Sequence, residues 1–335
     1  MNILIWHVHG AYTEAFVQGA HRYLLPTLPE GGPWGGGRAG RDWPANAVER
    51  TPDQLADDDV DVVVLQRPDE LELARSWLGR TPGRDVPAVY LEHNTPGGPA
   101  ATTRHPVADR DDLLLVHVTA FNDLMWDSGT TATTVVEHGV PDPGHRWTGE
   151  LPAAVAVINE PLRRGRVTGT DLLPLLAGPA GIDVFGMGTS GLGTALGTPS
   201  VRGMGDQPQQ RMHAELARRR VYVHTARWTS LGLSLIEAMM LGMPVAVLAT
   251  TEAARAVPPD AGVLATDPDL LRRGIAELAA DPTAATAAGT TARAAARARF
   301  GLDRFLRDWD AVLERAVAGP DVPVPAPAAA GGGGS

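Results

Sequence analysis

The chain has 335 residues, a net charge of −10 and a hydrophobic fraction of 44%. This length exceeds what one core of ordinary size needs, so we expect two domains, and the negative charge argues against nucleic acid or an anionic membrane as the main partner. The absence of cysteine excludes disulfides and cysteine-based zinc sites, and the absence of lysine leaves arginine, backbone N–H groups and hydroxyls to contact any phosphate.

The N-terminal sequence begins directly with a strand-like pattern. Residues 1–7 lack the basic region and the long apolar run that are typical of a signal peptide. No run of about 18 apolar residues occurs in the chain, so we expect no transmembrane segment. We therefore expect a cytoplasmic protein, and the sequence leaves its oligomeric state open.

The first 145 residues alternate short apolar runs with helix-like segments. Buried runs without a two-residue alternation, separated by helices, indicate a parallel sheet that is covered on both faces. Residues 1–145 are therefore predicted to form a Rossmann-like domain, with a glycine-rich loop at 31–40. The predicted strands are 3–8, 60–66, 88–93, 113–119 and 134–138, and the predicted helices include 14–25 and 70–78.

A Pro-Asp-Pro-Gly sequence at 141–144 breaks the chain, and we place the interdomain linker there. The pattern then restarts, so residues 146–300 are predicted to form a second Rossmann-like domain. An amphipathic helix over 301–317 is expected to cross back to the first domain, and residues 318–335, rich in Pro, Ala and Gly, are expected to be disordered. The second domain's predicted strands are 153–158, 182–185, 221–224 and 244–249, and its predicted helices are 170–177, 208–219, 234–241, 270–279 and 283–299.

The strongest chemical signal follows the predicted strand 221–224. Gly232 precedes a predicted helix, whose free backbone N–H groups attract phosphate. Glu237 lies about one turn further along, where a carboxylate suits the two vicinal hydroxyls of a ribose. A helix start with one solvated glutamate is the alternative. Because the neighbours of Glu237 in the sequence are apolar, its side chain should either turn outward or face a polar ligand.

This segment resembles the signature of family 4 glycosyltransferases, which are retaining enzymes with the GT-B fold. In that signature a Glu, a Gly and a second Glu precede Ala-Met, Gly and Pro-Val. Gly232 matches the Gly, and Glu237 matches the second Glu, which binds the nucleotide ribose in that family. The first Glu contacts the donor sugar, and Thr229 stands in its place here. The resemblance implies a donor-binding set of Thr229, Ser230, Leu231, Gly232, Leu233 and Glu237.

A second segment, residues 159–173, connects a predicted strand to a predicted helix. Its three arginines can clamp a diphosphate at the mouth of a parallel sheet, and a solvated basic turn is the alternative. In family 4 enzymes this loop carries an Arg and, five residues later, a Lys before a Gly. Arg163 matches the Arg, whereas Thr168 stands at the Lys position, so we expect Arg166 to supply the second charge.

Three further segments resemble parts of the same family. His93 ends a predicted strand, where open α/β sheets bind ligands; related enzymes have a His here that contacts the transferred sugar, and a structural role is the alternative. Gly10 lies in a loop that resembles the family's glycine loop near the acceptor and the donor phosphate. Gly186 lies in a strand-to-loop segment that often adjoins the nucleotide base. His138 replaces an Asn of the family and is predicted to be structural.

The resemblance implies an α/β protein of the GT-B type, with two Rossmann-like domains facing across a cleft. It implies transfer of a sugar from a nucleotide-diphosphate sugar to an unknown acceptor, with retention at the anomeric carbon (EC 2.4 class). His93, Arg163 and Arg166 are the predicted catalytic residues. No cofactor is expected, and no metal, because no Asp-x-Asp pair ends a predicted strand.

Two alternatives of other classes stay open. One is a nucleotide-sugar epimerase of the same fold, for which Glu92 and Asp69 are the candidate acid and base. The other is a catalytically degenerate nucleotide-sugar-binding protein, because Thr168 and Thr229 replace two contact residues of the family. Donor hydrolysis or sugar transfer would exclude the binding protein, and a change at C2 of the sugar would favour the epimerase.

Overall fold

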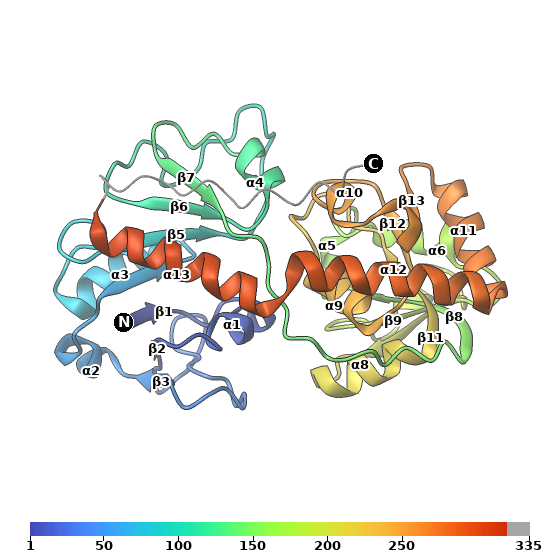
Figure 1. Ribbon diagram of the computed structural model, residues 1–335, viewed down its shortest axis with the longest axis horizontal. Coiled ribbons are helices and arrows are strands. Elements are labelled where there is room, and N and C mark those ends of the chain that lie inside the picture. The colour runs from blue at the N-terminus through green and yellow to red at the C-terminus, as the bar shows by residue number, and fades with distance from the viewer. Residues whose placement is uncertain (320–335) are drawn as a thin grey trace.

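The computed structural model describes residues 1–319 and consists of two α/β domains side by side (Figure 1). The first domain is built on a seven-stranded sheet in the order β3-β2-β1-β4-β5-β6-β7, and the second on a six-stranded sheet in the order β10-β9-β8-β11-β12-β13. All neighbouring strands within both sheets are parallel. Of the segment predicted to be disordered, 320–335 lie outside the described residues.

The first sheet is covered by helices on both faces. Every residue of β4, β5 and β6 is buried, which explains their continuous apolar runs. The strands are β1 (Asn2–Ile5), β2 (Arg22–Pro26), β3 (Ala47–Arg50), β4 (Val62–Leu65), β5 (Ala88–Glu92), β6 (Leu114–His117) and β7 (Ala132–Val135), and the helices are α1 (Gly10–Phe16), α2 (Pro52–Asp57), α3 (Asp69–Leu78) and α4 (Ala120–Met125).

The helix predicted over residues 14–25 is wrong. The structure ends α1 at Phe16 and forms β2 from Arg22. The apolar residues 23–25 suit either a helix or a buried strand, and parallel pairing with β1 on one side and β3 on the other decides for the strand. The edge strand β3 was not predicted, and β7 begins two residues before its predicted start at 134.

The second sheet repeats this architecture after a connection over residues 136–150. Its edge strands β10 and β13 were not predicted, because they are short and carry glycine, which weakens a strand pattern. The strands are β8 (Leu151–Val157), β9 (Ile182–Phe185), β10 (Val201–Gly205), β11 (Arg219–His224), β12 (Val245–Leu248) and β13 (Gly262–Ala265), and the helices are α5 (Pro161–Arg164), α6 (Leu173–Leu176), α7 (Leu192–Ala195), α8 (Gln209–Arg218), α9 (Leu233–Leu241), α10 (Ala253–Ala256), α11 (Pro268–Ala280) and α12 (Pro282–Phe300).

The last described helix, α13 (Leu302–Ala318), returns to the first domain. Figure 1 shows α12 lying over the second domain and α13 continuing across the first. One side of α13 is buried in the core of the first domain. Trp309 anchors it, because the indole N–H donates to the Tyr12 hydroxyl at 2.9 Å and the ring packs edge-on against Phe16.

The chain therefore crosses between the domains twice, and the two crossings lie side by side. The Val140 N–H donates to the Phe300 carbonyl at 3.0 Å. The Arg299 guanidinium ties both crossings to the second domain, because it pairs with Glu137 of the connection and with the fully buried Glu252. These ion pairs hold the two crossings in position where the domains meet.

We predict that Trp309→Ala destabilises the first domain by about 3–5 kcal/mol, since it leaves a cavity and removes the partner of Tyr12. Urea unfolding followed by circular dichroism measures the change. The matched control is Arg307→Ala on the exposed side of the same helix, which should change the free energy of unfolding by less than about 0.5 kcal/mol. Equal effects of the two variants would mean that α13 does not hold the first domain together.

Candidate functional site

The carboxyl-terminal ends of the strands in the two sheets face each other across the domain boundary. The Trp228 indole N–H, after β11, donates to the Pro96 carbonyl, after β5, at 2.9 Å. The Phe121 N–H, after β6, donates to Glu252, after β12, at 3.1 Å. Strand order reverses between β1 and β4 in one sheet and between β8 and β11 in the other. Open α/β sheets bind ligands at such points, so the space between the domains is the candidate site.

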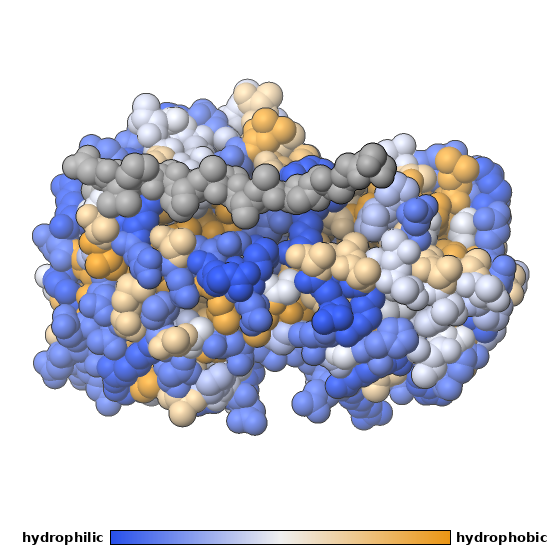
Figure 2. Space-filling view, viewed as in Figure 1, coloured by the Kyte–Doolittle hydropathy of each residue, from blue (hydrophilic) through white to orange (hydrophobic). Residues whose placement is uncertain are grey.

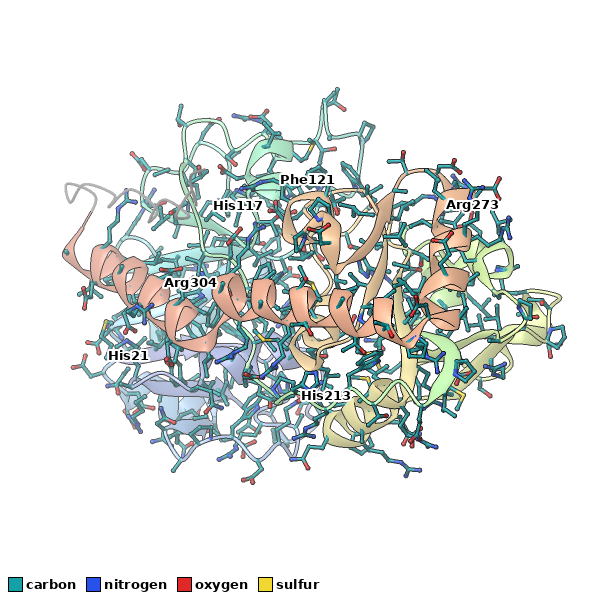
Figure 3. The ribbon with its side chains drawn as sticks, turned by 45° about the vertical axis from the view of Figure 1, so that its right-hand side comes forward. His21, His117, Phe121, His213, Arg273 and Arg304 are labelled. Atoms are coloured by element: carbon teal, nitrogen blue, oxygen red, sulfur yellow. The ribbon has the colours of Figure 1, made fainter. Side chains whose placement is uncertain are left out.

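The surface is hollowed where the two domains meet. Figure 2 shows a notch between the lobes at the lower edge, on the side of α8. Figure 3 shows His213 of α8 on this lower side and Phe121 on the upper side, where the domains touch. The contacts of Phe121 and Trp228 therefore close one side of the boundary and leave the other side open.

Glu237 lies in α9 and is buried, with 4% of its surface exposed. Its carboxylate does not turn outward. Gln209 donates to one carboxylate oxygen at 2.8 Å, and His213 Nε2 lies 3.4 Å from the other oxygen. Both partners come from α8, so this helix holds the carboxylate in place at the boundary. A buried carboxylate with two polar neighbours and no arginine partner keeps capacity to accept further hydrogen bonds.

The start of α9 depends on Gly232. A Cβ at this position would lie 2.7 Å from the His224 ring, so only glycine lets that ring pack beneath the helix start. Burial lowers the pKa of His224 to about 4, so the ring is neutral at physiological pH. Of the other predicted donor residues, Ser230 and Leu231 are buried, and Leu233 and Thr229 are partly exposed. These residues form the loop that faces the first domain.

The three arginines of the 159–173 segment point in different directions. Arg163 is 74% exposed and bonds to Glu160, and Arg166 is 78% exposed and bonds to Asp171. Arg164 is half-buried, and its side chain has no hydrogen-bond partner among the described residues. Burial, and then the neighbouring Arg163, lowers the pKa of Arg164. The charge of Arg164 also contributes to the lowered pKa of His9 in the first domain, and Arg164 is the least exposed of the three arginines in this loop.

Sequence reasoning did not select Arg164, because the family pattern has its arginine at position 163. The spacing of residues within a helical turn could have identified Arg164 from the sequence. Pro161 is buried at the start of α5, and Arg164, three residues later, lies on the same side of that turn. Thr168 is buried, and its hydroxyl forms hydrogen bonds with Gly165 and Thr170. This hydroxyl is therefore engaged within the loop.

His93 lies at the end of β5 and is buried. Its Nε2 lies 2.9 Å from the Gln66 side-chain oxygen, whose amide nitrogen donates to the Trp6 carbonyl. This network assigns the proton to Nε2 and leaves Nδ1 as an acceptor. Burial lowers the pKa of His93 well below its usual range, and neighbouring His9 and His138 lower it further. His93 is therefore a neutral, oriented imidazole.

Two other histidines surround this imidazole. The His9 ring centroid lies 4.2 Å from that of His93, and the Tyr12 ring packs against both His93 and His138. Burial lowers the pKa of His138 to about 4. His9 is more open to solvent, and partial burial together with the charges of Arg67 and Arg164 lowers its pKa. The mouth of the first sheet is thus lined by neutral imidazoles.

At Gly10 and Gly186, the two glycines predicted from the family resemblance, the absence of a side chain lets neighbouring groups pack closely. A Cβ on Gly10 would overlap the Arg41 guanidinium, which lies directly on this glycine. Gly186 has a φ of 124°, and a Cβ there would lie 2.6 Å from the Ile158 carbonyl oxygen. The ends of β8 and β9 therefore approach each other closely beside the predicted base position.

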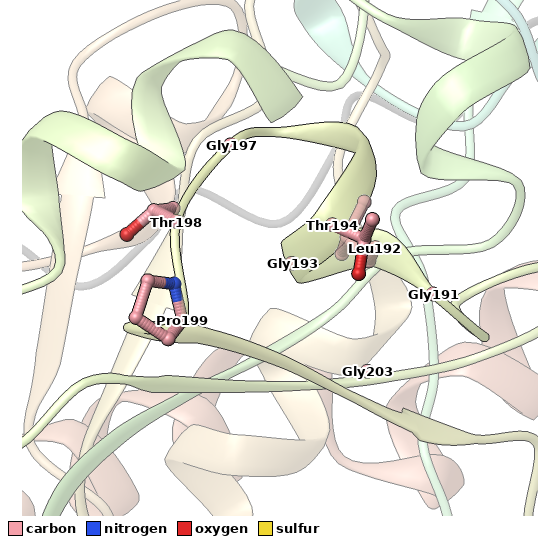
Figure 4. Close-up of a pocket in the computed structure, with 8 residues that line it drawn as sticks. All are labelled: Gly191, Leu192, Gly193, Thr194, Gly197, Thr198, Pro199 and Gly203. Carbon is pink, nitrogen blue, oxygen red and sulfur yellow. The ribbon is translucent and has the colours of Figure 1, made fainter.

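Other features lie outside this site. A pocket of about 400 Å³ at the outer edge of the second sheet is lined by glycine, leucine, threonine and proline, without a charged side chain (Figure 4). Within residues 1–319, no three His, Asp or Glu side chains gather as metal ligands, and no helix is long and apolar enough to span a membrane. The facing strand ends therefore remain the best-formed site.

Solved structures with similar folds support this architecture. The HepE protein of Anabaena, solved with UDP, matches at a TM-score of 0.69 and 16% identity, over 94% of this chain and 100% of that chain. The sucrose-phosphate synthase of Thermosynechococcus elongatus matches at 0.71 and 14%, over 95% and 99%. A glycosyltransferase of Rickettsia africae matches at 0.65 and 13%, over 94% and 98%. At these identities the likeness shows the fold alone.

A search of curated proteins found no match to this chain. The model of the family described as "Glycosyl transferases group 1" matches residues 195–295, a segment that runs from the end of α7 into α12 and includes Glu237. The chain therefore has the GT-B fold, and a segment of its second domain matches the model of the family described as "Glycosyl transferases group 1".

Proposed function

We propose that this protein is a glycosyltransferase that uses a nucleotide-diphosphate sugar and retains the configuration of the anomeric carbon. The observation that carries the proposal is the placement of Glu237, a buried carboxylate held by α8 at the cleft edge of the second sheet. The UDP complex of HepE is consistent with a nucleoside diphosphate as ligand. The retaining outcome rests on the resemblance to family 4 enzymes, and NMR of the product anomer tests it.

The second domain offers a matching group for each part of the donor. Glu237 accepts hydrogen bonds from the two ribose hydroxyls, after Gln209 moves away from the oxygen that it now occupies. The free N–H groups after Gly232 and the guanidinium of Arg164 face the diphosphate. Fixed positive potential at that point stabilises the charge that develops on the departing diphosphate.

The first domain would hold the acceptor and help to position the sugar. His93 presents Nδ1 as an acceptor for a sugar hydroxyl, while Gln66 fixes the other ring nitrogen. Because the ring is buried and neutral, it acts through hydrogen bonding rather than through charge. We extend the proposal to donor binding without a divalent metal, and calorimetry with UDP in EDTA tests it. Binding only after addition of magnesium or manganese would overturn this part.

The two alternative functions find less support. Of the candidate epimerase carboxylates, Glu92 already bonds to His105 at 3.1 Å and to the Asn94 N–H at 2.6 Å, and Asp69 is exposed at the start of α3. Glu92 is therefore not free to act as an acid or base. A binding protein without activity is excluded if the protein hydrolyses or transfers a nucleotide sugar, which is the direct test of the proposal.

We predict that Arg164→Gln weakens UDP binding by about 1.5–3 kcal/mol, roughly ten- to a hundredfold in Kd, because a charge-assisted contact to the diphosphate is lost. Calorimetry with UDP and with uridine measures it, and uridine binding should not change. Arg163→Gln and Arg166→Gln are the matched controls on the same loop. If either control weakens UDP binding more than Arg164→Gln does, the original assignment of Arg163 and Arg166 stands and that of Arg164 fails.

We predict that Glu237→Gln weakens UDP binding by about 1.5–3 kcal/mol through loss of charged hydrogen bonds to the ribose. The loss should largely vanish with the 2′,3′-dideoxy analogue, because the partner hydroxyls are absent from both measurements. Glu277→Gln on the exposed side of α11 provides the control and should bind UDP normally. An equal loss with both nucleotides would show that Glu237 supports the helix rather than the ribose.

A further inference from the structure

The first sheet has its own ligand-binding position, separate from the donor groups. Its strand order reverses between β1 and β4, so a crevice is expected beyond the ends of these two strands. His7 and His9 follow β1, and Gln66 and Arg67 follow β4. The crevice is therefore lined by basic and polar side chains of the first domain, beside His93.

Arg67 is held rigidly at this crevice. Its Nε donates to Glu70 at 2.7 Å, and Glu70 is fully buried and also accepts the backbone N–H groups of Gln66 and Arg67. The guanidinium carbon lies 4.0 Å from the centroid of the Trp34 ring, which belongs to the glycine-rich loop. Buried glutamate on one side and an aromatic face on the other keep the guanidinium in one orientation.

This guanidinium has hydrogen-bonding capacity that the protein does not use. Its Nη2 is buried and lacks a partner within the described residues, and the side chain as a whole is still 23% exposed. Buried donors without a partner are costly, and native proteins keep few of them without a functional reason. An arginine that is oriented but incompletely satisfied is typical of a site that binds an anion.

Arg41 supplies a second guanidinium at the loop that follows β1. It lies on Gly10, whose missing Cβ makes room for it. Its protein partner is Glu14, with Nη1 and Oε2 separated by 3.3 Å, and the Arg41 side chain is 40% exposed. Partial burial raises the pKa of Glu14, and Glu237 across the cleft adds to this effect. This long, partly exposed ion pair is weak, so a ligand can replace Glu14.

Each of the two arginines has a carboxylate partner, Glu70 for Arg67 and Glu14 for Arg41. Arg67 lowers the pKa of His9, and Arg41 lowers the pKa of His7, although burial is the larger cause for both histidines. Glu70 is engaged by Arg67 and two backbone N–H groups, whereas the Glu14 side chain is 28% exposed and, among the described residues, pairs with Arg41 alone, so the Arg41 pair is the one that a ligand can open.

We propose that the acceptor carries an anionic group, a carboxylate or a phosphate monoester, which Arg67 and Arg41 bind at the β1–β4 crevice. The inference rests on the proposed glycosyltransferase function and names the class of acceptor. With the anion held there, an acceptor hydroxyl lies toward His9 and His93. Its oxygen forms the bond to the anomeric carbon, the bond from that carbon to the diphosphate oxygen breaks, and the hydroxyl proton passes to the departing diphosphate.

The test measures anion binding in the UDP-saturated protein. Side-chain Nε–H NMR signals of the arginines are followed during titration with inorganic phosphate, glucuronate and, as the neutral counterpart, glucose. We expect saturable shifts at Arg67 and Arg41 with phosphate and glucuronate, and binding of glucose weaker by about tenfold or more. The first two probes distinguish phosphate from carboxylate as the anionic group.

Variants separate this inference from the donor assignment. Arg67→Gln and Arg41→Gln should each weaken binding of the anionic probe by about tenfold and leave the Kd of UDP unchanged. Arg41→Gln leaves no buried carboxylate unpaired, so it remains informative if Arg67→Gln unfolds. Arg75→Gln, on the exposed side of α3, is the control.

Absent shifts, or equal binding of glucose and glucuronate, would overturn the anionic acceptor while UDP still binds. Failure of UDP itself to bind would instead overturn the proposed function. The two proposals therefore fail by different measurements.

Discussion

The burial of one carboxylate determines how the second domain can be used. Removing a charge from water is costly unless polar groups compensate for the loss. At Glu237 the compensation comes from Gln209 and His213 of α8, rather than from an arginine that would saturate the carboxylate. The remaining residues of α9 from 235 to 241 are buried and apolar, so they fix the helix against the sheet. The carboxylate is thereby presented at the domain boundary with capacity for a ligand.

The same boundary depends on how the chain connects its two sheets. Two adjacent crossings, joined by Val140 and Phe300 and tied by Arg299, place the carboxyl-terminal strand ends opposite each other. Each sheet contributes groups of a different kind. The second offers a carboxylate and a helix start, and the first offers neutral imidazoles beside two arginines. This division suits two substrates that react with each other between the domains.

The sequence predicted those parts of the structure that depend on local patterns. Continuous apolar runs identified β4, β5, β6 and β12, and an isolated glutamate among apolar residues identified Glu237. The sequence does not show which strands pair in a sheet. Residues 23–25 were therefore predicted as a helix, although they form part of β2. The sequence also does not show in which direction a loop side chain points. Arg163 matched a family pattern and Arg166 was expected to replace the missing Lys, whereas Arg164 is the least exposed arginine of this loop. Arg67 follows β4, whereas Trp34 and Arg41 lie in the connection between β2 and β3, and only the fold brings Trp34 onto Arg67 and Arg41 onto Gly10.

A crystal structure of the protein with UDP tests the central claim most directly. The account predicts that the ribose hydroxyls bond to Glu237, that Gln209 leaves the carboxylate oxygen it occupies in the free protein, and that the diphosphate lies beside Gly232 and Arg164. UDP bound away from the facing strand ends, with the contact between Gln209 and Glu237 intact, would contradict it.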